Sequence, residues 1–250
     1  MALPKLNALP QYEVKIPSTG KSVKYRPFLV KEQKVLLMAL ETKDQRSIYN
    51  AMFNVIEACL EGAFFLQSKS IEDGTDVNSL TTYDIEYLFV MIRSKSVGEN
   101  IDLRMICLHD GCETPTPVAI PIDDLKAPVV QSKTKIVELT TDISLELEHP
   151  SISRVQEVAL NVDTNQTEVL LQLMKAAIKT VRTEDERIVF KEETESEQNE
   201  FIDNLNTQQL NEIMKFVQEI PAMQHDVEWT CTGCGKHNKR TLRGLSDFFS

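Results

Sequence analysis

Two close-spaced cysteine pairs, far apart along the chain, constrain this sequence more than any other feature. Four residues separate Cys107 from Cys112, and two separate Cys231 from Cys234. Both spacings are typical of the turns that supply thiolates to a structural zinc ion, which favours four tetrahedral ligands. A shared site would join segments 119 positions apart and so would brace the whole fold.

Each cysteine pair adjoins segments in which polar and apolar residues alternate. Segments 101–106 and 117–121 flank the first pair, and segment 226–230 leads into the second. Alternation is typical of half-buried strands, so the sequence predicts two β-hairpins with cysteines at their tips. We expect Gly233 and Gly235 to adopt backbone angles that point amides at sulfur.

Four thiolates would fill the coordination sphere of Zn²⁺ and leave no position for water. We therefore expect a structural rather than a catalytic ion. An alternative interpretation is two buried, reduced cysteine pairs. His109 and His237 flank the cysteines, where they could replace a ligand or lie exposed in the turns. Because the affinity for a structural metal becomes folding free energy, the metal-free chain should be less stable.

The order of predicted elements in the first part of the chain recurs in the second. Alternating residues around a turn predict a hairpin, and apolar residues at a spacing of three and four predict helices. The elements are a hairpin at 12–26, helices within 35–60 and 80–98, then a hairpin at 135–148 and helices within 155–178 and 207–217.

Spacing along the chain supports a duplication. Pro27 lies 80 positions before Cys107, and Pro150 lies 81 before Cys231. We predict an α+β fold of two pseudo-repeated halves, 1–128 and 129–250, which share a zinc-ribbon-like site. Each half would hold a β-hairpin, helices and a cysteine-tipped hairpin. Since side-chain identity between the halves is weak, chance together with the common habits of α+β proteins is the alternative explanation.

Charge and motif content argue against several classes of function. A formal net charge of −11 opposes binding to a phosphate backbone. No segment approaches the roughly 18 apolar residues that span a membrane, and the first residues lack the apolar region of a secretory signal. A Gly-rich phosphate loop, a nucleophile elbow and a paired-histidine metal motif are all missing. We expect a cytoplasmic, non-enzymatic protein without nucleic acid, membrane or small-molecule substrate as partner.

The C-terminal segment carries bulky apolar residues that need a surface to cover them. These residues are Leu242, Leu245, Phe248 and Phe249. Exposed aromatic clusters commonly mark interfaces, so one interpretation is that they bind a neighbouring protein. The other is that they cap the core of their own chain.

Several motifs carry a resemblance to a known family. They are PSTGK at 17–21, YRPFLVKE at 25–32, YDIEY at 83–87, RSKSVG at 93–98 and the ending at 231–249. On these motifs the chain resembles the baseplate hub assembly proteins of T4-like contractile-tailed phages, over nearly its full length. The resemblance implies a role in building the hub at the centre of the tail baseplate, with no catalytic residues.

Three classes of function remain open. The first, which we predict, is a structural or assembly protein of the virion baseplate that contacts other hub or wedge proteins. The second is a transient hub assembly chaperone that is absent from the mature virion. Both would work in the host cytoplasm during assembly. The third is a zinc-ribbon protein that binds nucleic acid, for which salt-sensitive binding would be required.

Overall fold

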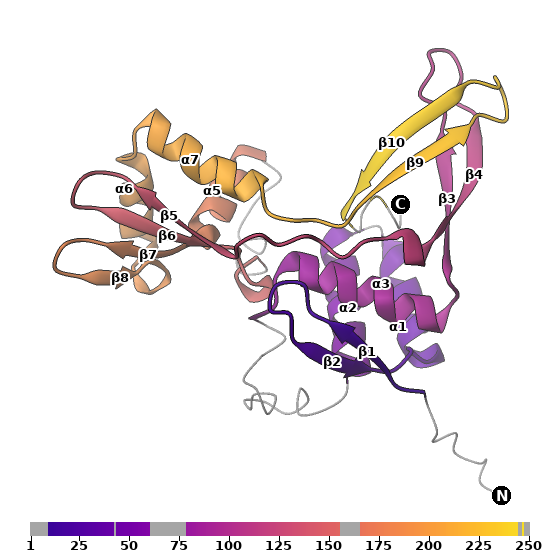
Figure 1. Ribbon diagram of the computed structural model, residues 1–250, viewed down its shortest axis with the longest axis horizontal. Helices are drawn as coiled ribbons and strands as arrows, with labels where there is room; N and C mark the ends of the chain where they lie inside the picture. The colour runs from indigo at the N-terminus through magenta and orange to yellow at the C-terminus, as the bar shows by residue number, and fades with distance from the viewer. Residues whose placement is uncertain (1–9, 43, 61–78, 156–165, 245–246, 248–250) are drawn as a thin grey trace, which may run out of the picture. The chain divides into compact units, whose positions relative to one another are not determined.

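The computed structural model describes residues 10–42, 44–60, 79–155, 166–244 and 247 (Figure 1). Contacts divide the chain into two compact units. The first unit is drawn from 1–77, 83–129 and 222–250, and the second from 78–82 and 130–221. Neither unit coincides with a predicted half, because the C-terminal hairpin belongs to the first unit. The pseudo-repeat therefore stays a prediction.

The first unit begins with a short antiparallel hairpin of β1 (Tyr12–Lys15) and β2 (Ser22–Tyr25). Its turn closes when the amide of Gly20 donates to the carbonyl of Ile16 at 2.8 Å. Gly20 has a φ of 69°, a region that residues with a Cβ rarely adopt. The hairpin expected at 12–26 is confirmed.

Three helices form the body of the first unit. They are α1 (Val30–Thr42), α2 (Gln45–Cys59) and α3 (Thr82–Ser96). Glu32 fixes the start of α1, because its carboxylate accepts from the amide of Leu29 at 2.7 Å and pairs with Arg26 at 3.0 Å. Asp44 caps α2 by accepting from the amide of Ser47. Helix α3 is the most buried of the three and contributes much of the core.

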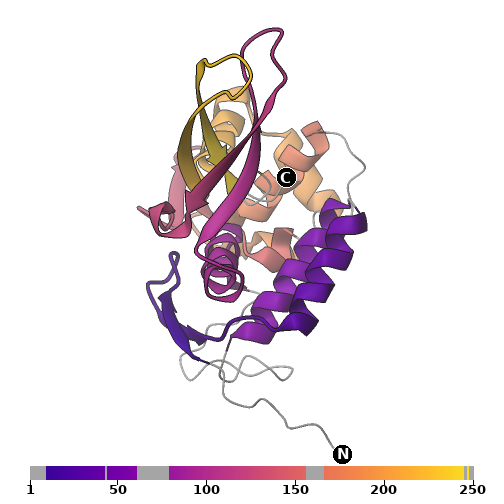
Figure 2. The ribbon, with the colours of Figure 1, turned by 90° about the vertical axis from the view of Figure 1, so that its right-hand side faces the viewer.

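Two longer antiparallel hairpins complete the first unit. One pairs β3 (Asn100–Ile106) with β4 (Pro115–Pro121), and the other pairs β9 (Gln224–Thr230) with β10 (His237–Arg243). A short 3-10 helix, η3 (Ile122–Asp124), follows β4. Figures 1 and 2 show the two hairpins side by side, and β4 contacts β9. Both predicted cysteine-tipped hairpins are confirmed.

The second unit is a four-stranded antiparallel sheet with helices on one face. The sheet order is β5-β6-β7-β8. The strands are β5 (Thr134–Glu138), β6 (Ser144–Glu148), β7 (Ile178–Arg182) and β8 (Arg187–Val189). The helices are α5 (Gln166–Ala177), η4 (Phe190–Glu192), α6 (Glu195–Asp203) and α7 (Thr207–Gln218).

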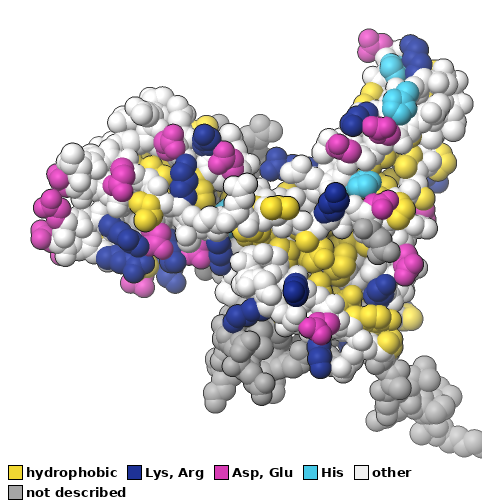
Figure 3. Space-filling model, in the orientation of Figure 1, with side chains coloured by type: hydrophobic (Ala, Val, Ile, Leu, Met, Phe, Trp, Pro, Cys, Tyr) yellow, Lys and Arg dark blue, Asp and Glu magenta, His cyan; other side chains and the backbone are white. Residues whose placement is uncertain are grey.

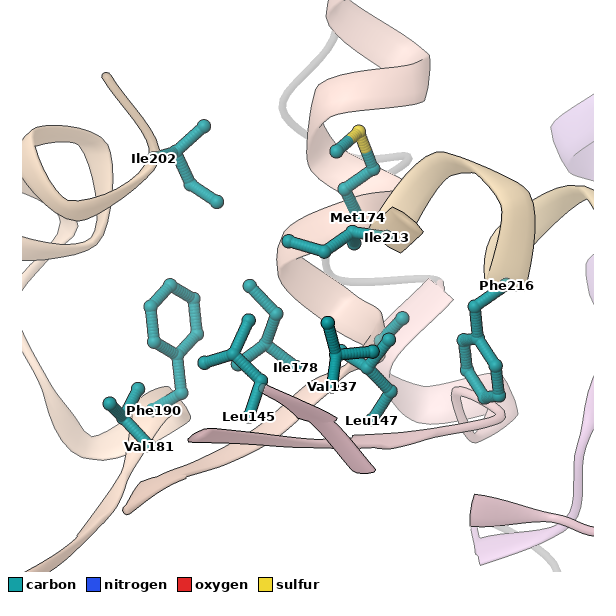
Figure 4. Packing of buried hydrophobic residues seen from close by; sticks show 11 residues of the cluster. Val137, Leu145, Leu147, Met174, Ile178, Val181, Phe190, Ile202, Ile213 and Phe216 are labelled. Carbon is teal, nitrogen blue, oxygen red and sulfur yellow. The ribbon is translucent and has the colours of Figure 1, made fainter. Parts of the chain in front are cut away.

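Apolar side chains fill the space between this sheet and its helices (Figure 4). Leu145 and Leu147 point from β6 into a cluster with Met174 of α5 and Ile213 of α7, and all four are fully buried. Intervening residues of β6 face the other way, as the period of two requires. Burial of this kind is the main favourable term in folding, so the second unit has a core of its own.

One expectation for the second unit is wrong. Ile178 was expected on a helix but begins β7, because strong apolar residues cannot by themselves separate a buried strand from a helix. The segment 184–200 contains β8, η4 and α6, and its acidic side chains are exposed. Its charges sit at a helix start, where Thr194 and Glu197 form a capping box.

Ion pairs cover the other face of the sheet. The carboxylate of Glu146 pairs with Lys179 at 3.2 Å and Arg187 at 3.0 Å, and also with Arg182. Lys and Arg side chains gather with acidic ones on this unit in Figure 3. A hydrogen bond from Arg182 is the largest cause that lowers the pKa of Glu146, to about 2, while partial burial opposes it.

Among the helices that the structure describes, none has the length and apolar content needed to cross a membrane.

Candidate metal centre

The tips of the two long hairpins bring the four predicted cysteines together. The Sγ atoms of Cys107, Cys112, Cys231 and Cys234 all lie within 4.8 Å of one another. The closest pairs cross between the hairpins: Cys107 to Cys234 and Cys112 to Cys231, each at 3.7 Å. Among the described residues this is the one cluster of His, Cys, Asp and Glu close enough to hold a metal ion.

These distances fit a tetrahedral thiolate site. Four sulfurs at a Zn–S distance of about 2.3 Å stand about 3.8 Å apart along each edge of the tetrahedron. A disulfide would instead need about 2.05 Å between sulfurs. The spacing of 3.7 Å therefore agrees with four ligands around one ion rather than with covalent pairs.

Local hydrogen bonds shape each cysteine turn. In the first, the amide of Cys112 donates to the carbonyl of His109 at 3.1 Å, and Gly111 takes a φ of 76°. In the second, the amide of Gly235 donates to the carbonyl of Cys231 at 3.0 Å, with a φ of 69° at Gly235. The glycine-specific backbone angle predicted for Gly235 agrees with this geometry, but its amide donates to a carbonyl and not to sulfur.

The amide of Gly233 points at sulfur as predicted, 3.4 Å from Sγ of Cys231, but glycine is required at this position for a steric reason. Its φ is not in the left-handed region. A Cβ at this position would lie 2.9 Å from the Cβ of Thr114 and closer still to the Thr114 hydroxyl. Glycine is therefore needed because the turn of one hairpin lies against Thr114, the residue just before β4 of the other. No single sequence segment reveals this contact.

Polar side chains also cross between the hairpins. The amide of Thr232 donates to Oγ1 of Thr116 at 3.2 Å. Asn238, which is 3% exposed, accepts from the amide of Leu108 at 2.8 Å through Oδ1 and donates to the carbonyl of Lys236 at 3.0 Å. The thiol of Cys107 lies 3.6 Å from the same Oδ1. A buried amide so satisfied fixes the register between the two tips.

Sequence reasoning missed Asn238, Thr116 and Thr232 as parts of the site. Each is a common surface residue type, and its bond to the other hairpin appears only when two distant segments pair. A weak signal exists for Asn238, since it stands in a strand where Asn is disfavoured and its neighbours alternate around it. A polar residue such as Asn238 on the buried face of a strand is expected to have a hydrogen-bond partner inside the protein.

The surroundings affect the cysteines unequally. Hydrogen bonding by the Cys234 backbone lowers the pKa of Cys231 to about 6, with a further contribution from the amide of Gly233 at 3.4 Å, although burial opposes both. The backbone of Lys236 lowers the pKa of Cys234, but burial and the three neighbouring thiols together outweigh it and raise that pKa to about 11. Thiolates packed this closely repel one another unless a cation lies among them.

The two histidines make contacts outside the sulfur cluster. Nε2 of His109 lies 3.0 Å from the carbonyl oxygen of His237. Nε2 of His237 lies 3.7 Å from the carboxylate of Glu228. Histidine side chains gather at the far end of the paired hairpins in Figure 3. These positions favour turn and strand contacts for both rings over replacement of a cysteine.

The remaining candidate residues lie elsewhere. Cys59 is fully buried at the end of α2, away from the cluster, and burial raises the pKa of its thiol to about 11. Leu242 lies in β10 and is 1% exposed, so it contributes to the core of its own chain rather than to a partner surface. Leu245, Phe248 and Phe249 lie outside the described residues.

Four cysteines from two hairpins, in a mixed α and β chain, thus lie close enough together to hold a metal ion. The chain matches the family model described as T4 bacteriophage base plate protein over residues 9–250, and it belongs to that family. It is thus a phage baseplate protein of a structural or assembly kind, whose partners include other baseplate proteins. Neither the curated proteins nor the solved structures include one that matches it.

Proposed function

We propose that this chain is a structural or assembly protein of the baseplate hub, and that one Zn²⁺ held by four cysteines fastens its two long hairpins together. Family membership over residues 9–250 supports the baseplate role. The observation that carries the zinc is the gathering of four sulfurs within 4.8 Å from segments 119 or more positions apart. Soft, charged thiolates are the usual ligands of structural zinc.

The bound ion serves the fold and not a reaction. Cys107 and Cys112 hold it from one hairpin, and Cys231 and Cys234 from the other. Bound zinc supplies a positive charge that offsets the repulsion among the thiolates. Asn238 keeps the two tips in register. A rigid pair of hairpins then presents a fixed surface to neighbouring hub or wedge proteins.

Zinc content tests the metal directly. The purified wild-type chain should contain one zinc per chain by elemental analysis, and Cys231→Ser should contain almost none. Cys59→Ser is the matched control, because it removes a cysteine that lies outside the cluster, and it should retain one zinc. Absence of zinc from the wild-type protein would rule the metal site out. Equal zinc content in Cys231→Ser and Cys59→Ser would rule it out as well.

Stoichiometry in purified phage particles tests the hub role. A fixed, integral number of copies in mature baseplates supports a resident subunit. Absence from mature particles, with the chain bound to hub proteins in assembly intermediates, would instead identify a transient chaperone. Absence from both would overturn the hub assignment, and the zinc result would stand independently.

The C-terminal residues are proposed as a contact for a hub partner. Leu245, Phe248 and Phe249 follow β10 directly. Truncation after Gly244 should leave the circular dichroism spectrum and zinc content unchanged and abolish incorporation into baseplates. Loss of folding would place these residues in the core of the chain itself.

A further inference from the structure

Exposed large hydrophobic side chains concentrate on and beside α1. Of the twelve such residues in the described part of the chain, six lie between positions 29 and 40. Val30 is 67% exposed, Leu37 53% and Met38 68%. Patches of this kind usually mark an interaction surface.

The helix buries only a narrow stripe. Glu32 and Ala39 are its buried residues, and α1 packs against α2 beside it (Figure 2). At 100° per residue, Val30, Leu37 and Met38 lie on the opposite side. Lys34 and Glu41 are exposed on the same side and frame the apolar residues along the helix axis. The outward face is therefore a short apolar patch that carries Lys34 and Glu41, with the exposed Lys31 at its edge.

This outward face is complementary to itself. Positions 34 and 41 are equally distant from the point midway between Leu37 and Met38. An antiparallel copy of the helix, related by a twofold axis at that point, places Lys34 beside Glu41 of the second copy, and does so twice. The same operation places Leu37 against Met38 of the second copy. Twofold interfaces require this property, because the same patch serves both subunits.

The charges of Lys34 and Glu41, which are unpaired within the part of the chain that the structure describes, also favour a second copy as partner. Glu41 stands in the last turn of α1, which holds no basic residue. A carboxylate there is opposed by the negative end of the helix dipole. Neither Glu41 nor Lys34 forms an ion pair with any residue that the structure describes. A second copy supplies the missing partner to both.

We propose that the outward face of α1 is a homodimer interface in which two helices pack antiparallel, with Lys34 of each chain paired to Glu41 of the other. Because a twofold axis pairs Lys34 with Glu41 twice, the charges favour a second copy of the chain over an unrelated helix as the partner. This interface lies on α1, whereas the metal ligands lie on the long hairpins, so dimerisation does not depend on the zinc.

A charge swap tests the proposal. The full-length, zinc-replete chain is studied under reducing conditions by sedimentation equilibrium. We expect a wild-type dimer. Lys34→Glu and Glu41→Lys should each raise the dissociation constant about tenfold or more, because each change turns two attractions into two repulsions. The double variant should return to within about threefold of wild type, since it restores both pairs.

Two further variants locate the surface. Leu37→Glu should yield a monomer, whereas Lys24→Glu, a reversal at an exposed position of β2, should leave the dimer unchanged. A monomeric wild-type chain would overturn the proposal and assign the patch to a different partner. A dimer that survives Leu37→Glu, or single charge variants that the double variant fails to restore, would overturn it equally.

Discussion

The tips of the long hairpins and the core of the second unit are held together by different means. In the second unit, a cluster of buried apolar side chains lies between the sheet and α5, α6 and α7. At the hairpin tips the facing residues are cysteines, threonines, a glycine and an asparagine, while Ile106 and Leu108 are exposed. One region relies on apolar area and the other on sulfur and hydrogen bonds.

This difference shows how geometry limits the choice of stabilising interaction. A sheet covered by three helices encloses enough volume for a core. Two hairpins meeting at their tips do not, and an isolated two-stranded hairpin is at best marginally stable in water. A metal site concentrates a large binding free energy in a few residues, which suits such a place. Each prediction below disturbs one region and asks whether the other responds.

Loss of the metal should have the largest effect and should stay local. Cys231→Ser is expected to lower the stability of the paired hairpins by several kcal/mol, about 3 or more, since the remaining thiols cannot hold the ion. Hydrogen exchange should quicken in β3, β4, β9 and β10, with α5 and α7 unchanged. Mass spectrometry of exchanged peptides measures both. Equally faster hydrogen exchange in both units would show that the two regions are not stabilised independently.

Removal of apolar volume should act on the second unit alone. Leu145→Ala is expected to cost about 3 kcal/mol, because Leu145 is fully buried and leaves a cavity beside Ile213 and Phe190. Denaturant unfolding measures the cost. Zinc content should remain at one per chain. A variant that also loses its zinc would show that the cysteine site depends on this core.

Gly233→Ala should cost about 2 kcal/mol, because the new methyl group collides with Thr114. Thermal unfolding of the zinc-bound chain measures the loss. The double variant with Thr114→Gly should recover part of it. Gly235→Ala is the matched control: its strain arises from a φ of 69° in open space, so Thr114→Gly should not relieve it. Relief in both would contradict the steric explanation.

The smallest expected effect concerns pH and the ion pairs of the second unit. The folded-state pKa of Glu146 is lowered to about 2 from 4.5, so its contribution is present above about pH 4.5 and is lost as the pH falls toward 2. Exposure of Arg182 and Arg187 reduces that contribution to about 1 kcal/mol. Unfolding free energies of wild type and Glu146→Gln should therefore converge across this range. If the unfolding free energies of the two proteins kept a constant difference across this pH range, the ion pairs of Glu146 would make no contribution to stability.

Much of the first unit could be predicted from local pattern. Alternation around Gly20 and at the cysteine pairs identified all three of its hairpins, and helical spacing located its helices. These signals lie within a few residues of one another in the chain. The four sulfurs were also predictable as a group, since metal ligands leave a spacing signature in the sequence.

The rest depends on contacts between distant segments. Thr114 and Gly233 are 119 positions apart, and no local pattern shows that the two cysteine turns lie against each other. Ile178 ends an apolar run that suits a helix and a strand equally well, and pairing with Leu147 of β6 decides for the strand. The acidic residues near Glu197 are exposed, and only the structure shows that Glu197 also completes the capping box of α6.

The discontinuity of the first unit has a consequence for synthesis on the ribosome. Cys107 and Cys112 emerge long before Cys231 and Cys234, and nearly the whole second unit, 130–221, is translated between them. At about 5 to 20 residues per second, several seconds separate the first pair of ligands from the second. The second unit can thus finish folding before the earlier hairpin meets its counterpart, and capture of the proposed zinc ion would be a late event in the synthesis of the chain.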